Sequence, residues 1–160
     1  SRLAHVVPLT VGGVLLAWHD MPWSWLTRRL WPRSPAPYWI GVVLLAGGLA
    51  FAIWARAHLG RNWSGTVTVK EGHELIRSGP YASVRHPIYT GLITAVLGTA
   101  IASGTVRAAI GVAVITAALA RKLRTEECFM RETFPGAYER YAAEVPALIP
   151  FTRPRRSAPR

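Results

Sequence analysis

Uncharged stretches separated by polar segments dominate the pattern along the 160-residue chain. Two of these stretches, residues 34–55 and 87–106, run for 22 and 20 residues without Asp, Glu, Lys or Arg. A helix that crosses a bilayer needs about 20 mainly apolar residues, so each stretch predicts a membrane span. Residues 3–18 and 108–120 are shorter uncharged stretches, and we expect them to form a first and a last span.

The residues that flank the two short stretches support the prediction that each stretch is a span. No small-x-small cleavage pattern ends the first one, so it predicts a retained span and not a signal peptide. Ser103-Gly104 separates the last two stretches and predicts a tight helical hairpin, whose second helix starts near Thr105 and continues past Arg121. Small residues are expected to let the two hairpin helices pack closely; they are Gly91, Ala95, Gly98, Ala102, Gly111 and Ala118.

The pattern therefore predicts an all-α integral membrane protein with about four transmembrane helices. The last two form a short hairpin, and cytoplasmic amphipathic helices follow at about residues 121–134 and 136–144, divided by Pro135-Gly136. Three segments are predicted along the chain: an N-terminal two-span hairpin at 1–57, a core at 58–151, and a basic disordered tail at 152–160.

Composition supports a membrane protein and excludes other classes. Hydrophobic residues make up 51% of the chain and charged residues 17%, against about 25% charged in ordinary soluble domains. That hydrophobicity excludes global disorder, and Cys128, as the only cysteine, excludes an intrachain disulfide. The net charge is +11. In a chain with long uncharged stretches, such a charge indicates arginines at an anionic membrane surface, and we expect no nucleic-acid partner.

The basic residues also predict an orientation. Four spans would put 15 of the 19 Lys and Arg residues on the side that holds both termini and the 56–86 loop. The positive-inside tendency assigns that side to the cytoplasm, so we expect a multi-pass cell-membrane protein with its active site and both termini cytoplasmic. The other side holds four arginines, and the Arg28–Arg33 cluster among them runs against the tendency.

A polar cluster flanks the predicted hairpin. Arg85 and His86 precede Pro87 at the start of one span, and Glu126-Glu127 lie just beyond the next. Because a hairpin returns the chain to the same surface, we expect the two groups to meet there. A cationic group facing a carboxylate pair suits a zwitterionic ligand. The alternative is that Arg85 only reaches the membrane surface, His86 caps a helix, and the glutamates are solvated.

Motifs for metal, phosphate-loop and serine-hydrolase chemistry are missing from the sequence: it has no HExxH, CxxC, GxGxxG, Walker or GxSxG pattern. We therefore expect no metal site.

The polar cluster belongs to a longer pattern along the chain. Its parts are His73-x-Leu75-Ile76-x-x-Gly79-Pro80-Tyr81, Arg85-His86-Pro87-x-Tyr89-x-Gly91, Glu126-Glu127, and Phe134-x-x-x-Tyr138-x-x-Tyr141-x-x-x-Val145-Pro146-x-x-Ile149-Pro150-Phe151. This pattern resembles the isoprenylcysteine carboxyl methyltransferase family, whose scheme the related phospholipid methyltransferases share. Membrane sterol reductases carry a similar RHPNYxG, but Ile88 stands here in place of that Asn.

The resemblance implies S-adenosylmethionine as the methyl donor. Arg85, His86 and Tyr89 would hold its methionyl carboxylate, and Glu126 or Glu127 its ammonium or ribose. The adenine pocket would be lined by Leu75, Gly79, Pro80 and Tyr81, with His73 facing or backing the adenine. Tyr138 and Tyr141 would help to close the site, unless they are interfacial aromatics. Arg85, His86 and Glu127 are the catalytic candidates, and Arg140 is the best remaining cation for an acceptor carboxylate.

The function implied is a membrane methyltransferase that acts on a lipid-like or small hydrophobic acceptor. O-methylation of an isoprenylcysteine carboxylate is the family default, and phospholipid amines and small thiols stay open as acceptors. Two other classes are an NADPH-dependent sterol-type reductase and a non-enzymatic membrane adaptor. The partners expected are the bilayer and the acceptor, with no obligate protein partner.

Overall fold

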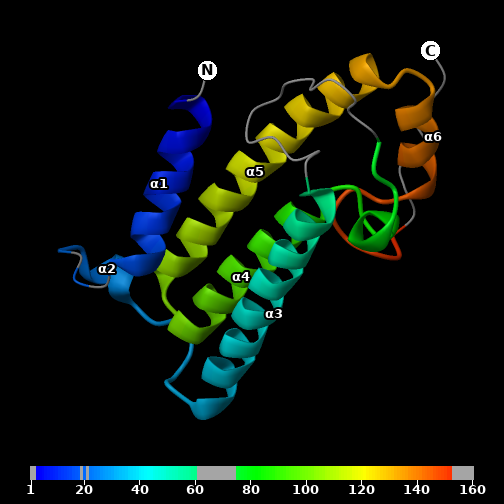
Figure 1. Cartoon of the computed structure of the whole chain (residues 1–160). Helices are drawn as coiled ribbons and strands as arrows, with labels where there is room; N and C mark the ends of the chain where they lie inside the picture. The colour runs from blue at the N-terminus through cyan, green and yellow to red at the C-terminus, as the bar shows by residue number, and fades with distance from the viewer. Residues whose placement is uncertain (1–2, 19, 21, 61–74, 153–160) are drawn as a thin grey trace. The chain divides into compact units, whose positions relative to one another are not determined.

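Helices make up the fold of residues 3–18, 20, 22–60 and 75–152, which are the residues that the computed structural model describes. Within them no strand forms, and the one extended contact is an isolated bridge between Arg29 and Thr105. The predicted all-helical class is confirmed. The elements are α1 (Leu3–Ala17), α2 (Ser24–Thr27), α3 (Pro35–Leu59), the 3₁₀ helix η2 (Gly79–Ala82), α4 (Pro87–Ser103), α5 (Val106–Thr133) and α6 (Ala137–Glu144), of which the α-helices are labelled in Figure 1.

Helix α3 is the clearest candidate for a membrane span. Of the described helices, it is the one that is both long enough and apolar enough to cross a bilayer. Many of its large apolar side chains are exposed, including Val43 at 68% and Ile53 at 67%, as lipid contact requires. Helices α1 and α4 are apolar but shorter. The structure therefore supports one span directly, and the count of four stays a prediction.

Contacts divide the chain into two units that are discontinuous in sequence. Unit 1 comprises Ser1–Ala50 and Gly91–Lys122, and unit 2 comprises Phe51–Thr90 and Leu123–Arg160. The segments predicted from the sequence, 1–57, 58–151 and 152–160, run consecutively instead and stay predictions.

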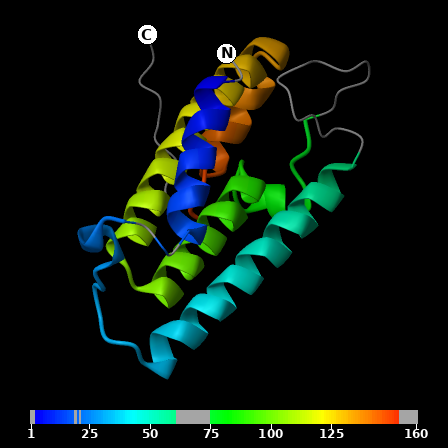
Figure 2. The same cartoon turned by 90° about the vertical axis from the view of Figure 1, so that its left-hand side faces the viewer.

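Unit 1 is held together by close helix–helix packing through glycine. A Cβ placed at Gly48 of α3 would lie 2.5 Å from the Gly91 carbonyl oxygen of α4 and 2.6 Å from the Ala95 nitrogen, and Gly41 meets Gly98 in the same way. These contacts bring the backbones of α3 and α4 together (Figure 2). The predicted partner of the small residues in α4 was therefore wrong: they face α3, not α5.

Gly111 of helix α5 packs against α1 instead. A Cβ at Gly111 would lie 2.9 Å from the Gly12 carbonyl oxygen. The spacing of small residues shows that they share one face of a helix. It does not show which neighbouring helix packs on that face. Close approach of this kind is the usual role of small residues between membrane helices.

The turn predicted at Ser103-Gly104 is present, and the membrane hairpin of the last two spans stays a prediction. Helix α4 ends at Ser103, Gly104 has a φ of 61°, and α5 begins at Val106. A positive φ is unfavourable for residues that have a Cβ, whereas glycine adopts it readily. Helix α5 continues past Arg121 to Thr133, so the piece expected at 121–134 is the end of this helix. Gly136, with a φ of 73°, turns the chain into α6. The loop expected at 19–36 contains the one-turn helix α2.

Candidate active site

The Arg85-His86 loop of unit 2 is fixed to the segment that follows α6. The Arg85 backbone N–H donates to the Pro146 carbonyl at 2.9 Å, and that of His86 donates to the Ala147 carbonyl at 3.0 Å. Thr90 Oγ1, in the first turn of α4, donates to the Leu148 carbonyl at 2.7 Å. Three consecutive carbonyls after α6 therefore position the loop that carries the candidate cations.

The guanidinium of Arg85 joins the ends of two helices. Its Nε and Nη2 donate to Glu127 Oε1 at 3.0 and 2.5 Å, from near the end of α5. Its Nη1 donates to the carbonyls of Ala142 and Val145, at 3.0 and 2.6 Å, at the end of α6. The Arg85 and Glu127 side chains are only 10% and 15% exposed. The expected meeting of Arg85 with a glutamate is thus present, and most of the N–H groups of Arg85 are already used within the protein.

His86 lies between the two glutamates. Its Nε2 is 3.3 Å from Glu127 Oε1, and its Nδ1 is 4.0 Å from Glu126 Oε2. The His86 ring stacks on the Tyr89 ring with centroids 5.8 Å apart, and the Tyr89 hydroxyl donates to Glu126 Oε1 at 2.5 Å. The alternative of solvated glutamates and an isolated helix cap is therefore not what the structure shows.

Glu127 stays ionised in this environment. Burial by itself would raise the pKa of its carboxyl, but hydrogen bonds from His86 and Arg85 and the charge of Arg85 outweigh burial and lower the pKa from 4.5 to about 2. At neutral pH the cluster therefore contains an anion matched to the Arg85 cation. A group with matched charges of this kind accepts a zwitterion more readily than it accepts a single charge.

Tyr138 and Tyr141 project from α6 into the interior of unit 2, and each is 2% exposed. The Tyr141 hydroxyl donates to the Tyr81 carbonyl at 2.6 Å. The Tyr138 hydroxyl is buried and has no hydrogen-bond partner among the described residues. Burial and the charge of Glu127 raise the pKa of Tyr138, so it keeps its proton at neutral pH. Both rings are buried, which rules out the interfacial alternative.

Burial of a donor without a partner is costly, and such a group in a native fold requires an explanation. The Tyr138 hydroxyl belongs to the same part of unit 2 as Arg85, since the charge of Arg85 contributes to its pKa. Trp31 Nε1 in unit 1 is the other buried side-chain atom that has no hydrogen-bond partner among the described residues.

The residues expected around adenine gather at η2. Gly79 has a φ of 60°, Pro80 and Tyr81 are buried, and Leu75 is half-buried. A Cβ at Gly79 would lie 2.7 Å from the His58 ring, so a larger residue there would have to displace that ring. His73 lies outside the described residues.

His58, at the end of α3, is a site residue that the sequence analysis missed. Its Nε2 lies 2.9 Å from the Ser78 hydroxyl, and its ring stacks on Tyr81 with centroids 6.5 Å apart. The available signal was a histidine three residues beyond the longest uncharged stretch, which ends at residue 55. Arg77 was missed as well: its Cζ lies 5.3 Å over the Tyr141 ring, and its Nη2 pairs with Glu144. Arg140 is exposed on α6 and makes no ion pair within the described residues.

Comparison with known proteins identifies the family of the chain. The model of the Isoprenylcysteine carboxyl methyltransferase (ICMT) family matches residues 39–132, which is more than half of the chain. The fold is similar to that of a solved eukaryotic intramembrane Ras methyltransferase, ICMT, with a TM-score of 0.61 and 23% identity, over 94% of this chain and 52% of that one.

Among curated proteins, protein-S-isoprenylcysteine O-methyltransferase B of Arabidopsis thaliana is 28% identical over 126 residues, which cover 75% of this chain and 64% of that protein. The Schizosaccharomyces pombe protein-S-isoprenylcysteine O-methyltransferase is 33% identical over 61% of this chain and 42% of its own length. The cobalt-zinc-cadmium resistance protein CzcN of Cupriavidus metallidurans is 31% identical over 70% of this chain and 51% of its own. The chain thus spans less than two thirds of each of these relatives. From the match of the family model, the chain belongs to the isoprenylcysteine carboxyl methyltransferase family.

Proposed function

We propose that this chain carries the catalytic site of a membrane-embedded methyltransferase that uses S-adenosylmethionine and methylates a lipid-like or small hydrophobic acceptor. The observation that carries the proposal is the buried group of Arg85, His86 and Glu127 beside the unpartnered hydroxyl of Tyr138, in a chain of this family. Within the described residues, nothing favours the reductase or the adaptor.

The residues of unit 2 suit the donor's two ends. Its methionyl end carries one carboxylate and one ammonium, and the cluster offers the His86 imidazole beside the Glu126 carboxylate, with His86 Nδ1 4.0 Å from Glu126 Oε2. Glu127 is committed to Arg85, whereas the Glu126 side chain is 27% exposed against 15% for Glu127. We therefore assign the ammonium to Glu126. In this assignment Arg85 is mainly a positioning residue, which holds Glu127 and the end of α6 in place.

The adenosine end would face η2. Gly79 permits close approach of the backbone, while Tyr81 and His58 present stacked rings. The Tyr138 hydroxyl is a buried donor that a ribose oxygen or a carboxylate would satisfy. When bound, the donor supplies a methyl group activated by a sulfonium.

The chemistry left to the protein is orientation and exclusion of water. A carboxylate acceptor is already a nucleophile at neutral pH, whereas an amine, a thiol or a phenol would need a general base. The ionised state of Glu127 and its contacts with Arg85 and His86 make it a structural anion and not a base. This favours a carboxylate acceptor, with isoprenylcysteine as the family default and with phospholipid amines and small thiols as the competitors. Exposed Arg140 is available to bind an acceptor carboxylate.

The site is proposed to lie at the cytoplasmic surface, with both termini on that side, because 15 of the 19 basic residues fall there in a four-span arrangement. Labelling a single cysteine introduced at Ser157, in a Cys128→Ser background, checks this orientation. Labelling only from the outside would contradict it.

The test of function is calorimetric titration of the purified protein with S-adenosylhomocysteine, followed by assays with radiolabelled S-adenosylmethionine and native membranes. We expect Arg85→Ala and Glu127→Ala each to weaken binding by about 2–5 kcal/mol, since each removes one partner of a desolvated charge pair. Arg124→Ala and Glu139→Ala change exposed residues on α5 and α6 and serve as matched controls. The label should partition into a lipid-extractable product. Label in RNA or soluble protein, or wild-type binding in both variants, would contradict the proposal.

A further inference from the structure

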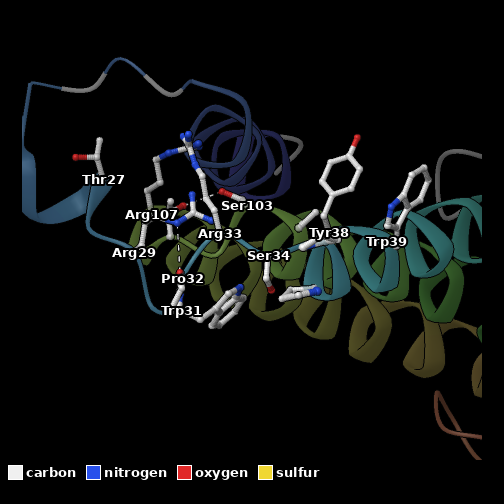
Figure 3. A pocket seen from close by; sticks show the side chains of 14 residues that line it. Thr27, Arg29, Trp31, Pro32, Arg33, Ser34, Tyr38, Trp39, Ser103 and Arg107 are labelled. Carbon is white, nitrogen blue, oxygen red and sulfur yellow. Dashed lines mark hydrogen bonds between the residues drawn. The ribbon is translucent and has the colours of Figure 1, made fainter.

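A second polar site lies in unit 1 and shares no residue with the Arg85–Glu127 cluster of unit 2. An open pocket of about 820 Å³ is lined by the segment from α2 to the start of α3 and by the α4–α5 turn. Its lining includes three arginines and three large aromatic residues, and we call it the arginine pocket. Figure 3 shows these side chains, which are Arg29, Arg33, Arg107, Trp31, Tyr38 and Trp39.

Arg107 is the buried cation of this pocket, with 7% of its surface exposed. Its Nη1 donates to the carbonyls of Leu15 and Leu16, both at 2.8 Å, at the end of α1. These carbonyls carry the partial negative charge of a helix C-terminus. They are its only hydrogen-bond acceptors within the described part of the chain, so Nε and Nη2 are left for a ligand.

No carboxylate in unit 1 balances this charge. The sequence of residues 1–50 and 91–122 contains a single acidic residue, Asp20, and the described residues form no ion pair between it and Arg107. Burying a cation without a counter-charge is strongly unfavourable.

The other two arginines add positive charge to the same cavity. Arg29 donates from Nε to the Trp31 carbonyl at 3.3 Å, and Arg33 is exposed and makes no ion pair among the described residues. Three guanidinium groups around one cavity repel one another, and an anion bound among them would remove that repulsion. The guanidinium fork matches the oxygen geometry of phosphate and can bind it through two hydrogen bonds.

The position of the pocket in unit 1 indicates which phosphate. Helix α3, the candidate span, begins at Pro35 on the wall of the pocket. One end of a spanning helix lies at the depth of the lipid headgroups. Tyr38 and Trp39 are 52% and 62% exposed at that end, as expected of aromatics at a membrane interface. Further along α3, Ile40 and Val43 are 55% and 68% exposed and form an apolar surface.

We propose that the arginine pocket binds the phosphate of an anionic phospholipid, whose acyl chains lie along the exposed apolar surface of α3. This role also explains why the Arg28–Arg33 region keeps its charge in a loop where the topology rule disfavours it. The proposal does not depend on methyl transfer, because it uses only unit 1.

The test is native mass spectrometry of the full chain, released from nanodiscs of dioleoylphosphatidylglycerol mixed with dioleoylphosphatidylcholine. We expect the wild type to retain phosphatidylglycerol in preference to phosphatidylcholine. Arg29→Gln and Arg33→Gln should each reduce that preference roughly tenfold, the low end for losing a hydrogen bond to a charged group. Arg28→Gln is the matched control, since Arg28 is an exposed neighbour that does not line the pocket. Equal retention of the two lipids, or a double variant that behaves like the wild type, would overturn the proposal.

A second measurement distinguishes lipid phosphate from free phosphate. Thermal unfolding in neutral detergent is followed with added phosphatidylglycerol or with inorganic phosphate. The Tm of each variant without either addition shows whether the variant is folded. We expect phosphatidylglycerol at micromolar concentration to raise the Tm of the wild type and not that of Arg29→Gln/Arg33→Gln, and inorganic phosphate to have little effect below tens of millimolar. If inorganic phosphate matches the lipid with the same dependence on the arginines, the occupant is a free anion and the lipid assignment is wrong.

Discussion

Arg85 in unit 2 and Arg107 in unit 1 occupy similar local settings with opposite charge balance. Each is largely buried, and each donates from Nη1 to two carbonyls at the end of a helix. Arg85 also pairs with Glu127, whereas Arg107 has no carboxylate among the described residues. We therefore expect a ligand of the Arg85 cluster to be nearly neutral overall, and the proposed occupant of the arginine pocket to bring the negative charge.

Removing the counter-charge of Arg85 in unit 2 should have the largest effect on the free energy of unfolding. We expect Glu127→Gln to lower the free energy of unfolding by about 3–5 kcal/mol, because Arg85 would then be buried without its partner. Chemical unfolding in detergent measures the effect, with Glu139→Gln on the exposed face of α6 as the control. A loss below about 1 kcal/mol would show that the carbonyls alone can hold Arg85, as they do for Arg107.

Acid should remove the same counter-charge gradually. The folded pKa of Glu127 is lowered from 4.5 to about 2, so its contribution is complete above pH 4.5 and declines as the pH falls toward 2. The expected decline is roughly 3 kcal/mol across that window. Unfolding measured between pH 5 and pH 2 checks it. Glu127→Gln should lack this component, and an unchanged pH profile in that variant would assign the loss to other carboxyls.

Replacing Arg107 tests the other half of the comparison. Arg107→Met gives up two hydrogen bonds but also removes an unbalanced buried charge, so we expect the free energy of unfolding in neutral detergent to change by no more than about 1–2 kcal/mol. Arg28→Met, at an exposed neighbour, is the matched control. A loss as large as that of Glu127→Gln would mean that Arg107 is balanced within the protein after all.

The smallest expected effect distinguishes two tyrosines on one helix. Tyr141→Phe should lower the free energy of unfolding by about 1 kcal/mol, because it deletes the hydrogen bond to the Tyr81 carbonyl. Tyr138→Phe removes a hydroxyl that has no partner among the described residues, so stability should be unchanged or slightly higher. Its binding of S-adenosylhomocysteine should weaken instead. Calorimetry and unfolding of both variants give the comparison, and the reverse order would remove Tyr138 from the site.

Features encoded locally could be predicted from the sequence. The turn at Gly104 and the continuity of α5 past Arg121 follow from a glycine and from an unbroken helical pattern. The meeting of Arg85 with Glu127 followed from the hairpin, since a hairpin returns the chain to one surface.

Features set by tertiary packing could not be predicted in this way. The small residues of α4 meet α3 because of where α3 lies, not because of their spacing. The carbonyls that accept from Arg85 belong to residues 57 and 60 positions away, and backbone groups leave no mark in the pattern of side chains. The His58 ring packs against Gly79, where a Cβ would lie 2.7 Å from it, and the sequence does not show that approach.

The attachment of the Arg85 loop to the carbonyls of residues 142–148 has a consequence for biosynthesis. Arg85, His86 and the first turn of α4 are translated well before the acceptors of Val145 to Leu148 exist. Until those residues are made, the Arg85 guanidinium lacks these carbonyl acceptors and has to remain hydrated. The docking of α6 and its following segment is therefore the step that dehydrates Arg85, so a late-made part of the chain completes the Arg85 cluster.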